Sequence, residues 1–393
     1  MKKNSLLLAG TIAVTIFSLS CKNAATLKTA EKAPTINHKI AAASTVTRNP
    51  NLNIVYFIPK DLDTLAGYRK RLSDVLLWLQ DWYGKEMTRH GYGYKTFGLA
   101  NNGAGGVKIV TIKANLPKSS YPYTGGYPAV ANEVNAYFTR HPADKTSDHS
   151  LIIIPRYTVG ANGEVLGGGP FYGVGHWCYA LDYEQMNLKN LGKNDAIGTE
   201  FSKWFGGMAH EMAHALHVPH NFQKVSEDPI LGTTLLGYGN YTLGKSPTFL
   251  SAADAAILNV SQVLNNNSNT YYGQVTSNIN KISINYSNTL ASIVVSGKFT
   301  STGHVTSILY YNDPSIGGDS HDYNAVAWES KKIGVDSFRV VMPIADLQQK
   351  ANGTHYILRI RLVHNNGILA MYEYPYTFSG GVPVFPSLPK YNE

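Results

Sequence analysis

Four of the chain's thirteen histidines fall within eleven residues, and this segment constrains the fold and the chemistry more than any other. Residues 210–220 read HEMAHALHVPH. His210 and His214 are one helical turn apart, so both imidazoles project from one face of a helix and can bind one metal ion. Glu211 is placed to take a proton from metal-bound water. The segment therefore predicts a helix that carries a zinc site.

The apolar residues of this helix lie on the side opposite to the histidines. At about 100° per residue, His210, His214 and His217 centre about 180° away from the apolar stripe. Seven residues form that stripe: Phe201, Trp204, Phe205, Met208, Met212, Ala215 and Leu216. Histidines of a protein core would lie on the stripe, so their position favours metal ligands over core residues.

Either His217 or His220 can supply the third ligand. His217 lies about 10.5 Å along the helix axis from His210, an awkward reach for one tetrahedral ion. Pro219 disfavours the helical conformation of the residue before it, so we expect the helix to end near His217 and the chain to turn back with His220. We therefore expect His210, His214 and His220 to bind Zn²⁺. Three carboxylates remain alternative ligands: Glu227, Asp228 and Asp254.

The sequence resembles the metzincin metallopeptidases at four positions of their HExxHxxGxxH signature: His210, Glu211, His214 and His220. His217 replaces the signature glycine, which normally adopts a left-handed backbone at the end of the helix. Histidine is among the few other residues enriched in that conformation. The resemblance covers roughly residues 51–265 and implies a mixed, twisted sheet with long helices.

Metzincins also have a turn below the zinc that contains a methionine, in some branches as Ser-x-Met-x-Tyr. Residues 234–238 read TLLGY, with Leu236 at the Met position and Tyr238 at the Tyr position. Leucine conserves the volume and apolarity of methionine, so we expect a hydrophobic floor below the metal. The resemblance implies that Tyr238 approaches the zinc or a developing oxyanion. A structural role for Tyr238 is the alternative.

The resemblance implies a zinc metalloendopeptidase that hydrolyses peptide bonds in a protein or peptide substrate. Zinc would activate a water molecule, with Glu211 as general base and then as proton donor to the leaving amine. In metzincins an edge strand above the cleft pairs with extended substrate. The segment Phe171–Asp182 is the candidate for that strand.

A binding protein is the alternative function. His217 and Leu236 depart from the signature, so a catalytically weakened surface lipoprotein that binds glycan or protein through its C-terminal β module also fits. Nucleic-acid binding has no motif in its favour. Residues 1–50 hold seven Lys or Arg and one Glu, so they carry +6 of the net charge of +8 and leave +2 for the rest.

The first fifty residues predict export. Lys2 and Lys3 precede an uncharged stretch of about 15 residues, the pattern of a signal peptide over residues 1–20. Ser18, Leu19, Ser20 and Cys21 resemble the lipobox of bacterial lipoproteins, which implies a lipid on Cys21 and attachment to the membrane of the cell envelope. Secretion without lipid is the alternative. Residues 21–51 lack apolar periodicity and are interpreted as a tether.

The rest of the chain divides into two parts. Residues 52–270 alternate β-branched runs with amphipathic helices, which predicts an α+β domain. Its strand candidates are residues 54–58, 107–112 and 151–154. After a polar linker at 271–280, short strand-like runs separated by turns fill residues 281–380 and predict an all-β, immunoglobulin-like sandwich. Residues 381–393 are interpreted as a tail.

Overall fold

The computed structural model describes residues 50–267, 269–315 and 322–386. The predicted signal peptide, Cys21 and nearly all of the predicted tether lie outside the described residues. Among the helices that the structure describes, none combines the length and the apolar character that a membrane span requires.

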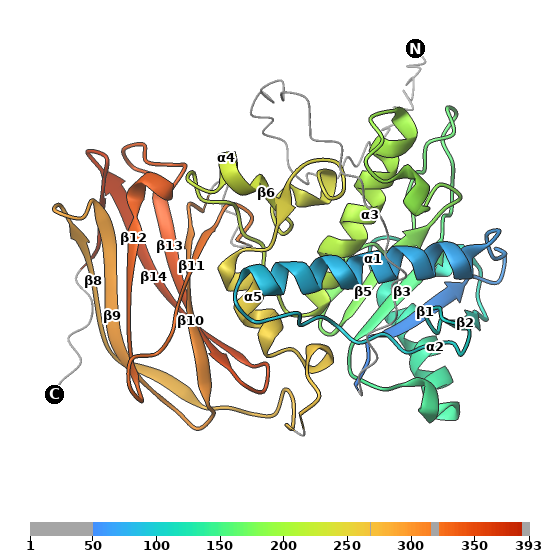
Figure 1. Ribbon diagram of the computed structural model, residues 1–393, viewed down its shortest axis with the longest axis horizontal. Helices are drawn as coiled ribbons and strands as arrows, with labels where there is room; N and C mark the ends of the chain where they lie inside the picture. The colour runs from blue at the N-terminus through green and yellow to red at the C-terminus, as the bar shows by residue number, and fades with distance from the viewer. Residues whose placement is uncertain (1–49, 268, 316–321, 387–393) are drawn as a thin grey trace, which may run out of the picture. The chain divides into compact units, whose positions relative to one another are not determined.

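A five-stranded sheet forms the first part of the described chain (Figure 1). Its strand order is β2-β1-β3-β5-β4. Four strands are parallel and β4 is antiparallel to β5. The strands are β1 (Asn53–Ile58), β2 (Val110–Lys113), β3 (Ser150–Pro155), β4 (Gly173–Val174) and β5 (Trp177–Asp182). Every residue of β1 and β3 is buried, as is typical of parallel strands that are covered on both faces.

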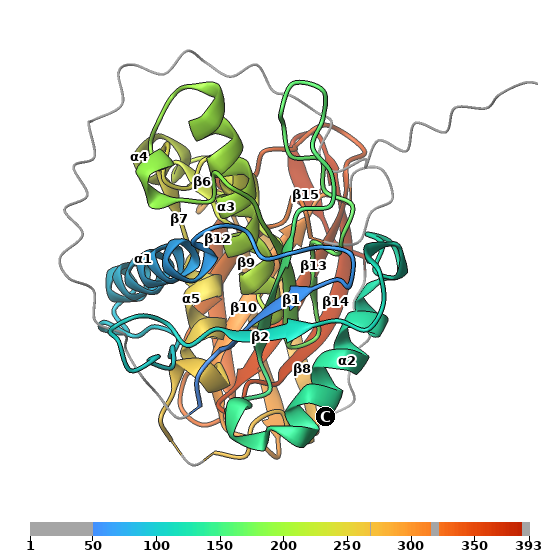
Figure 2. The same ribbon diagram turned by 90° about the vertical axis from the view of Figure 1, so that its right-hand side faces the viewer.

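Helices cover the sheet on both faces. Helix α1 (Tyr68–Arg89) and helix α2 (Tyr127–Arg140) lie on opposite sides of β1 and β2 in Figure 2. The chain moves from β1 to β2 and then back past β1 to β3, so right-handed crossovers place the two helices on opposite faces. Helix α3 (Ala196–Ala215) packs beside α1, where the Tyr83 hydroxyl donates to the carbonyl oxygen of Ala209 at 3.1 Å.

Short elements connect α3 to the C-terminal part: α4 (Asp228–Leu231), β6 (Thr233–Thr234), β7 (Thr248–Phe249) and α5 (Ala252–Asn259). Strands β6 and β7 pair in parallel. Helix α5 begins with a capping box, in which the side chain of Ser251 accepts from the backbone of Asp254 and the side chain of Asp254 accepts from the backbone of Ser251. The cap fixes the start of a helix that contacts β11 of the C-terminal part.

Two antiparallel sheets pack face to face in the C-terminal part, with strand orders β11-β10-β13-β14-β15 and β12-β9-β8. The strands are β8 (Ser277–Ser287), β9 (Ser292–Ser301), β10 (Val305–Asp313), β11 (Val326–Ser330), β12 (Ser337–Pro343), β13 (His355–His364), β14 (Leu369–Ser379) and β15 (Val382–Val384). One buried cluster joins the two sheets. The described chain therefore has a mixed α/β fold with several sheets, and the immunoglobulin-like type of the sandwich stays a prediction.

Strand β10 of the five-stranded C-terminal sheet is buried on both faces. In β10, Ile308 and Tyr310 belong to the core of the sandwich, whereas Leu309 and Tyr311 belong to the core of the first part. Side chains alternate between the two faces of a strand, so one strand contributes to both cores. The described residues accordingly fall in one compact unit, although the predicted boundary at 271–280 itself stays a prediction.

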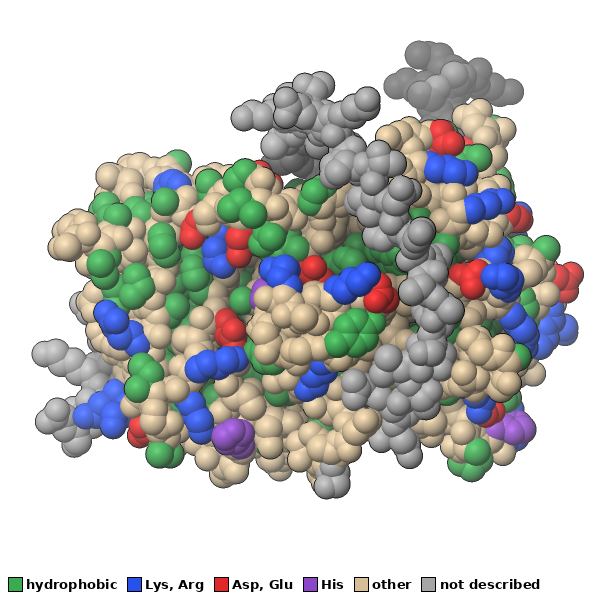
Figure 3. Space-filling model, viewed as in Figure 1, with side chains coloured by type: hydrophobic (Ala, Val, Ile, Leu, Met, Phe, Trp, Pro, Cys, Tyr) green, Lys and Arg blue, Asp and Glu red, His purple; other side chains and the backbone are tan. Residues whose placement is uncertain are grey.

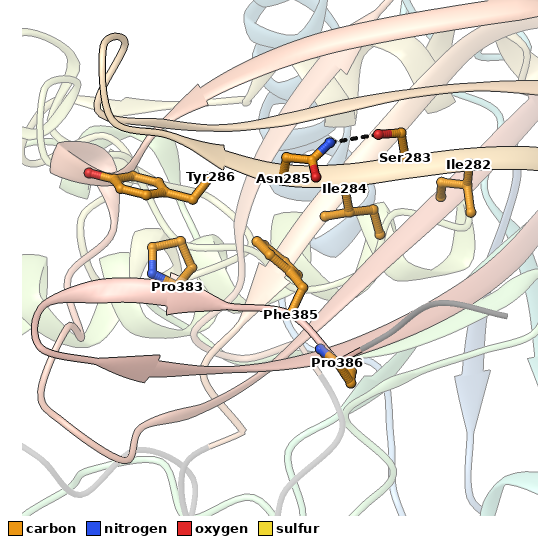
Figure 4. A pocket seen from close by; sticks show the side chains of 8 residues that line it. All are labelled: Ile282, Ser283, Ile284, Asn285, Tyr286, Pro383, Phe385 and Pro386. Atoms are coloured by element: carbon orange, nitrogen blue, oxygen red, sulfur yellow. Dashed lines mark hydrogen bonds between the residues drawn. The ribbon is translucent and has the colours of Figure 1, made fainter. Parts of the chain in front are cut away.

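A groove opens between the edge strands β8 and β15 (Figure 4). Its volume is about 490 Å³. It is lined by Ile282, Ser283, Ile284, Asn285, Tyr286, Pro383, Phe385 and Pro386. The lining contains no carboxylate, lysine, arginine or histidine side chain, so the groove offers a surface for binding but none of the usual metal ligands.

Charged side chains are interspersed on the face shown in Figure 3, where Lys and Arg lie beside Asp and Glu. This distribution matches the small net charge of +2 that the sequence assigns to residues 51–393.

The shared core predicts that Leu309→Ala destabilises the whole described chain. Leu309 is fully buried, and removing its side chain leaves a cavity that typically costs about 2–5 kcal/mol. Urea unfolding followed by circular dichroism measures the change. Leu290→Ala is the matched control, because Leu290 is 51% exposed and its loss should change the free energy of unfolding by less than about 0.5 kcal/mol. Equal stability of the two variants would contradict a shared core.

Candidate metal centre

Three imidazoles converge at the end of α3. His214 Nε2 lies 3.0 Å from His210 Nε2 and 3.0 Å from His220 Nε2. Within the described ranges, these residues are the one group of three or more His, Cys, Asp or Glu whose possible ligand atoms all lie within 4.8 Å of one another. His210 and His214 project from adjacent turns of the helix, and His220 reaches them from the segment that follows.

Backbone carbonyls determine the tautomers of two of these rings. His210 Nδ1 lies 2.8 Å from the Leu235 oxygen, and His214 Nδ1 lies 2.8 Å from the Val218 oxygen. A carbonyl oxygen only accepts, so each Nδ1 carries the hydrogen and each Nε2 presents a lone pair. Burial lowers the pKa of His210 to about 3 and lowers that of His214, which keeps both rings neutral.

This donor set fits a zinc ion. Two lone pairs that face each other at 3.0 Å repel unless a cation lies between them. Two imidazoles bound to one tetrahedral zinc, with Zn–N distances of about 2.0–2.1 Å, have nitrogens about 3.3 Å apart, close to the observed separation. Carbonyl contacts at Nδ1 are also typical of zinc-binding histidines.

A left-handed residue follows the end of α3. Helix α3 ends at Ala215, and His217 has a φ of 70°. Histidine therefore adopts the conformation that the resemblance assigns to glycine at this position. The Val218 amide then donates back to the Ala213 oxygen at 3.0 Å, which closes the turn and redirects the chain toward His220.

His217 belongs to a second histidine cluster. Its Nε2 lies 2.9 Å from His176 Nδ1, at the start of β5. His149, which directly precedes β3, lies next to both rings, and its Nδ1 is 2.8 Å from the Ala215 oxygen. The Tyr272 ring completes the cluster. These contacts tie the end of α3 to the starts of two strands, and no local pattern in the sequence predicts them.

Strand β4 crosses α3 in contact with Glu211. The Gly173 amide donates to Glu211 Oε2 at 2.8 Å, and burial raises the pKa of this carboxyl to about 7. A Cβ atom at Gly173 would lie 2.4 Å from His214 Cβ, so only glycine permits this approach. The segment Phe171–Asp182 forms two strands rather than one: β4 lies at the edge of the sheet, and β5 lies inside it.

The predicted turn below the metal lies beside the histidines. Leu236 is fully buried, and the carbonyl of its neighbour Leu235 contacts His210. Tyr238 is half-buried and its ring meets Phe222 edge-on, with ring centres 5.6 Å apart.

The alternative carboxylate ligands lie outside the group of three histidines. Asp254 is fully buried, where it accepts from the Asn221 side chain at 2.5 Å. Glu227 pairs with Lys224 at 2.8 Å. Asp228 accepts from the Gln223 side chain at 3.3 Å.

Three tyrosines at this centre were missed from the sequence. The Tyr323 ring lies 4.0 Å from the His220 ring, centre to centre. Tyr123 is 48% exposed, and the negative charge of Glu211 contributes, after burial, to raising the pKa of its hydroxyl. The Tyr172 ring meets that of Tyr123 edge-on at 5.7 Å. Tyrosine is abundant throughout the chain, so no local pattern distinguishes these three from tyrosines of the core.

Comparison with solved structures gives matches along most of the chain. Wild-type OgpA from Akkermansia muciniphila is 35% identical, with a TM-score of 0.81, over 87% of this chain and 97% of OgpA. A second crystal form of the wild type is 34% identical, with a TM-score of 0.80, and the match covers 91% of this chain and 100% of the OgpA chain. No protein-family model matches the chain. A search of curated proteins likewise gives no match.

A third solved structure contains a ligand. It holds catalytically inactive OgpA in complex with an O-glycopeptide substrate, glycodrosocin. This structure is 34% identical, with a TM-score of 0.82, over 91% of this chain and all of the OgpA chain. Such identity over the full length of OgpA establishes kinship beyond a shared fold, and the chain belongs to the OgpA family.

Proposed function

We propose that this protein is a zinc-dependent peptidase that cleaves O-glycosylated peptides. The convergence of three imidazole Nε2 atoms beside the Glu211 carboxylate is the observation that carries the proposal. Kinship with OgpA, which has been crystallised with an O-glycopeptide substrate, supports the same activity and suggests the class of substrate.

His210, His214 and His220 would hold the zinc, which when bound acidifies water and polarises the peptide carbonyl. Glu211 takes the proton from the attacking water and passes it to the leaving amine. The Gly173 amide orients the carboxylate of Glu211 by donating a hydrogen bond to Oε2. Tyr238 is proposed to stabilise the developing oxyanion, the role that the metzincin resemblance implies.

The tyrosines beside Glu211 suit a glycosylated substrate. Tyr123 and Tyr127 are 48% and 36% exposed, and the rings of both contact Tyr172, which precedes β4. Exposed aromatic rings offer flat apolar faces on which sugars stack. The outer edge of β4 is available for pairing with an extended peptide, which would place the substrate backbone next to the carboxylate.

The alternative function, a binding protein that acts through its β module, would use a surface such as the groove between β8 and β15. None of the three histidines lines that groove, so substitutions can test the peptidase and the binding function separately.

The peptidase and the binding protein differ in the effects that they predict for Glu211→Gln and His210→Ala on zinc content and peptidase activity. We expect Glu211→Gln to retain about one zinc per chain but to lose at least about 10³-fold in kcat/KM, because the general base is removed. His210→Ala should lose the metal as well, whereas His304→Ala, at an exposed position, should lose neither. Metal analysis and peptidase assays of the purified variants measure both properties. A Glu211→Gln protein as active as the wild type would refute the mechanism.

The class of substrate predicts a dependence on glycan. A peptide with one O-glycan should be cleaved at least about tenfold faster, in kcat/KM, than the same peptide without it, a difference of about 1.4 kcal/mol. Tyr123→Ala should reduce this ratio, and Tyr94→Ala, at another exposed tyrosine, should preserve it. Mass spectrometry of the products measures cleavage. Equal cleavage of the two peptides would contradict the substrate class and leave the peptidase intact.

The protein is proposed to be exported and lipid-anchored to the bacterial cell envelope through Cys21, with secretion as the alternative. Cys21→Ser should abolish incorporation of a fatty-acid label and release the protein from the membrane fraction. Cys178→Ser is the matched control, because the Cys178 thiol is fully buried and should not affect labelling. Label that persists in Cys21→Ser would contradict the anchor.

A further inference from the structure

The third imidazole of the metal centre is covered by a residue from the C-terminal sheets. Tyr323 lies in the connection between β10 and β11, and its ring centre is 4.0 Å from that of His220, with the ring planes 32° apart. The two rings are tilted relative to each other and in contact. The three imidazoles meet one another at larger angles, of 88°, 73° and 42°. Among the described ring neighbours of His220, Tyr323 therefore has the nearest ring and the one closest to parallel.

A buried ionic cluster holds the backbone beside Tyr323. Asp322 directly precedes it, is 4% exposed, and has a left-handed φ of 61°. Its two carboxylate oxygens accept from Arg359 and Arg361, which project from the same face of β13. Arg359 also bonds to Asp313 at 2.7 Å. Aspartate is among the few residues other than glycine that are enriched in this left-handed conformation, and the bonds to the two arginines hold the turn in it.

Backbone hydrogen bonds join the segments that carry the two rings. The Phe222 amide, two residues after His220, donates to the Ala325 oxygen at 2.7 Å. The Ala325 amide in turn donates to the Asp322 oxygen at 2.9 Å, which closes a turn around Tyr323. His220 is thus two residues from Phe222, and Tyr323 is two residues from Ala325. The hydrogen bond between Phe222 and Ala325 joins the two segments.

The burial of the Asp322 cluster indicates that its role is to hold the chain in one arrangement. Arg359 and Arg361 are 2% and 6% exposed, and Arg361 also stacks on the Tyr311 ring at 4.2 Å. Removing several charges from water is costly, and well-packed apolar residues often stabilise a core equally well. Although Arg361 Nη1 is buried without a hydrogen-bond partner, the remaining charge-assisted hydrogen bonds of the cluster favour one defined arrangement, because losing any of them would leave a buried charge without its partner.

We propose that Tyr323 is a positioning residue of the metal centre, and that the Asp322 cluster holds it against His220 to fix the ring plane of the third ligand. The C-terminal sheets thereby complete the zinc site rather than forming a separate binding module. This inference rests on the proposed zinc site but not on the proposed substrate. Partners that orient a metal ligand typically change the affinity for the metal by about 10- to 100-fold.

The test measures metal binding by the full chain. Apo-protein is titrated with Zn²⁺ against a chromophoric chelator, and the absorption spectrum of the Co²⁺-substituted protein reports the ligand geometry. We expect Tyr323→Ala to weaken zinc binding by about 10- to 100-fold and to alter the cobalt spectrum. Tyr323→Phe keeps the aromatic ring against His220 and should match the wild type within about twofold, as should Tyr94→Ala. Circular dichroism of each apo-variant verifies that it is folded.

Asp322→Asn provides a second route to the same result, because it keeps both aromatic side chains but weakens the ionic cluster that holds Tyr323 against His220. We expect it to weaken zinc binding in the same direction as Tyr323→Ala.

The outcomes separate this inference from the proposed function. A wild type that binds no zinc would overturn both. A wild type that binds zinc, with Tyr323→Ala unchanged in affinity and cobalt spectrum, would overturn only the positioning role. Loss of activity in Tyr323→Ala with unchanged metal binding would also overturn it, because the ring would then act on the substrate instead.

Discussion

Two hydrogen bonds, from the Nδ1 atoms of His210 and His214 to backbone carbonyls, determine which nitrogens of the site are free to bind a metal ion. The oxygens of Leu235 and Val218 each accept a hydrogen bond from one Nδ1–H, so Nε2 of His210 and Nε2 of His214 present lone pairs that face each other. That arrangement is unfavourable without a cation. Both carbonyls belong to segments that follow the helix, and the left-handed residue His217 directs the chain into them. The position of the whole centre therefore depends on how α3 ends.

The convergence of His210, His214 and His220 could be predicted from the sequence because its determinants are local. Helical spacing places His210 and His214 on one face, and Pro219 indicates that the helix does not continue to His220; it ends at Ala215. The strand candidates at 54–58 and 151–154 likewise form β1 and β3, since buried parallel strands read as continuous apolar runs. Even the departure from glycine at His217 could be anticipated, because histidine is one of the residues that tolerate a positive φ.

The parts that could not be predicted depend on contacts between distant segments. Tyr323 reaches His220 only because β10 and β11 pack against the first part of the chain, and nothing in the local sequence specifies that packing. Gly173 was similarly one glycine among many until the structure showed it against Glu211 and His214. The edge strand was predicted too long, since the hairpin turn that separates β4 from β5 lies between Val174 and Trp177.

The shortness of β4 has a consequence for selectivity. A peptide that pairs with a two-residue strand gains few backbone hydrogen bonds, so the backbone alone would hold it weakly. A shift by one residue turns every side chain to the opposite face, and so few bonds cannot prevent it. For the proposed peptidase, the register of the substrate must then come from what the peptide carries on its side chains. Such an enzyme would recognise a modification next to the cleaved bond and tolerate wide variation in the surrounding amino acids.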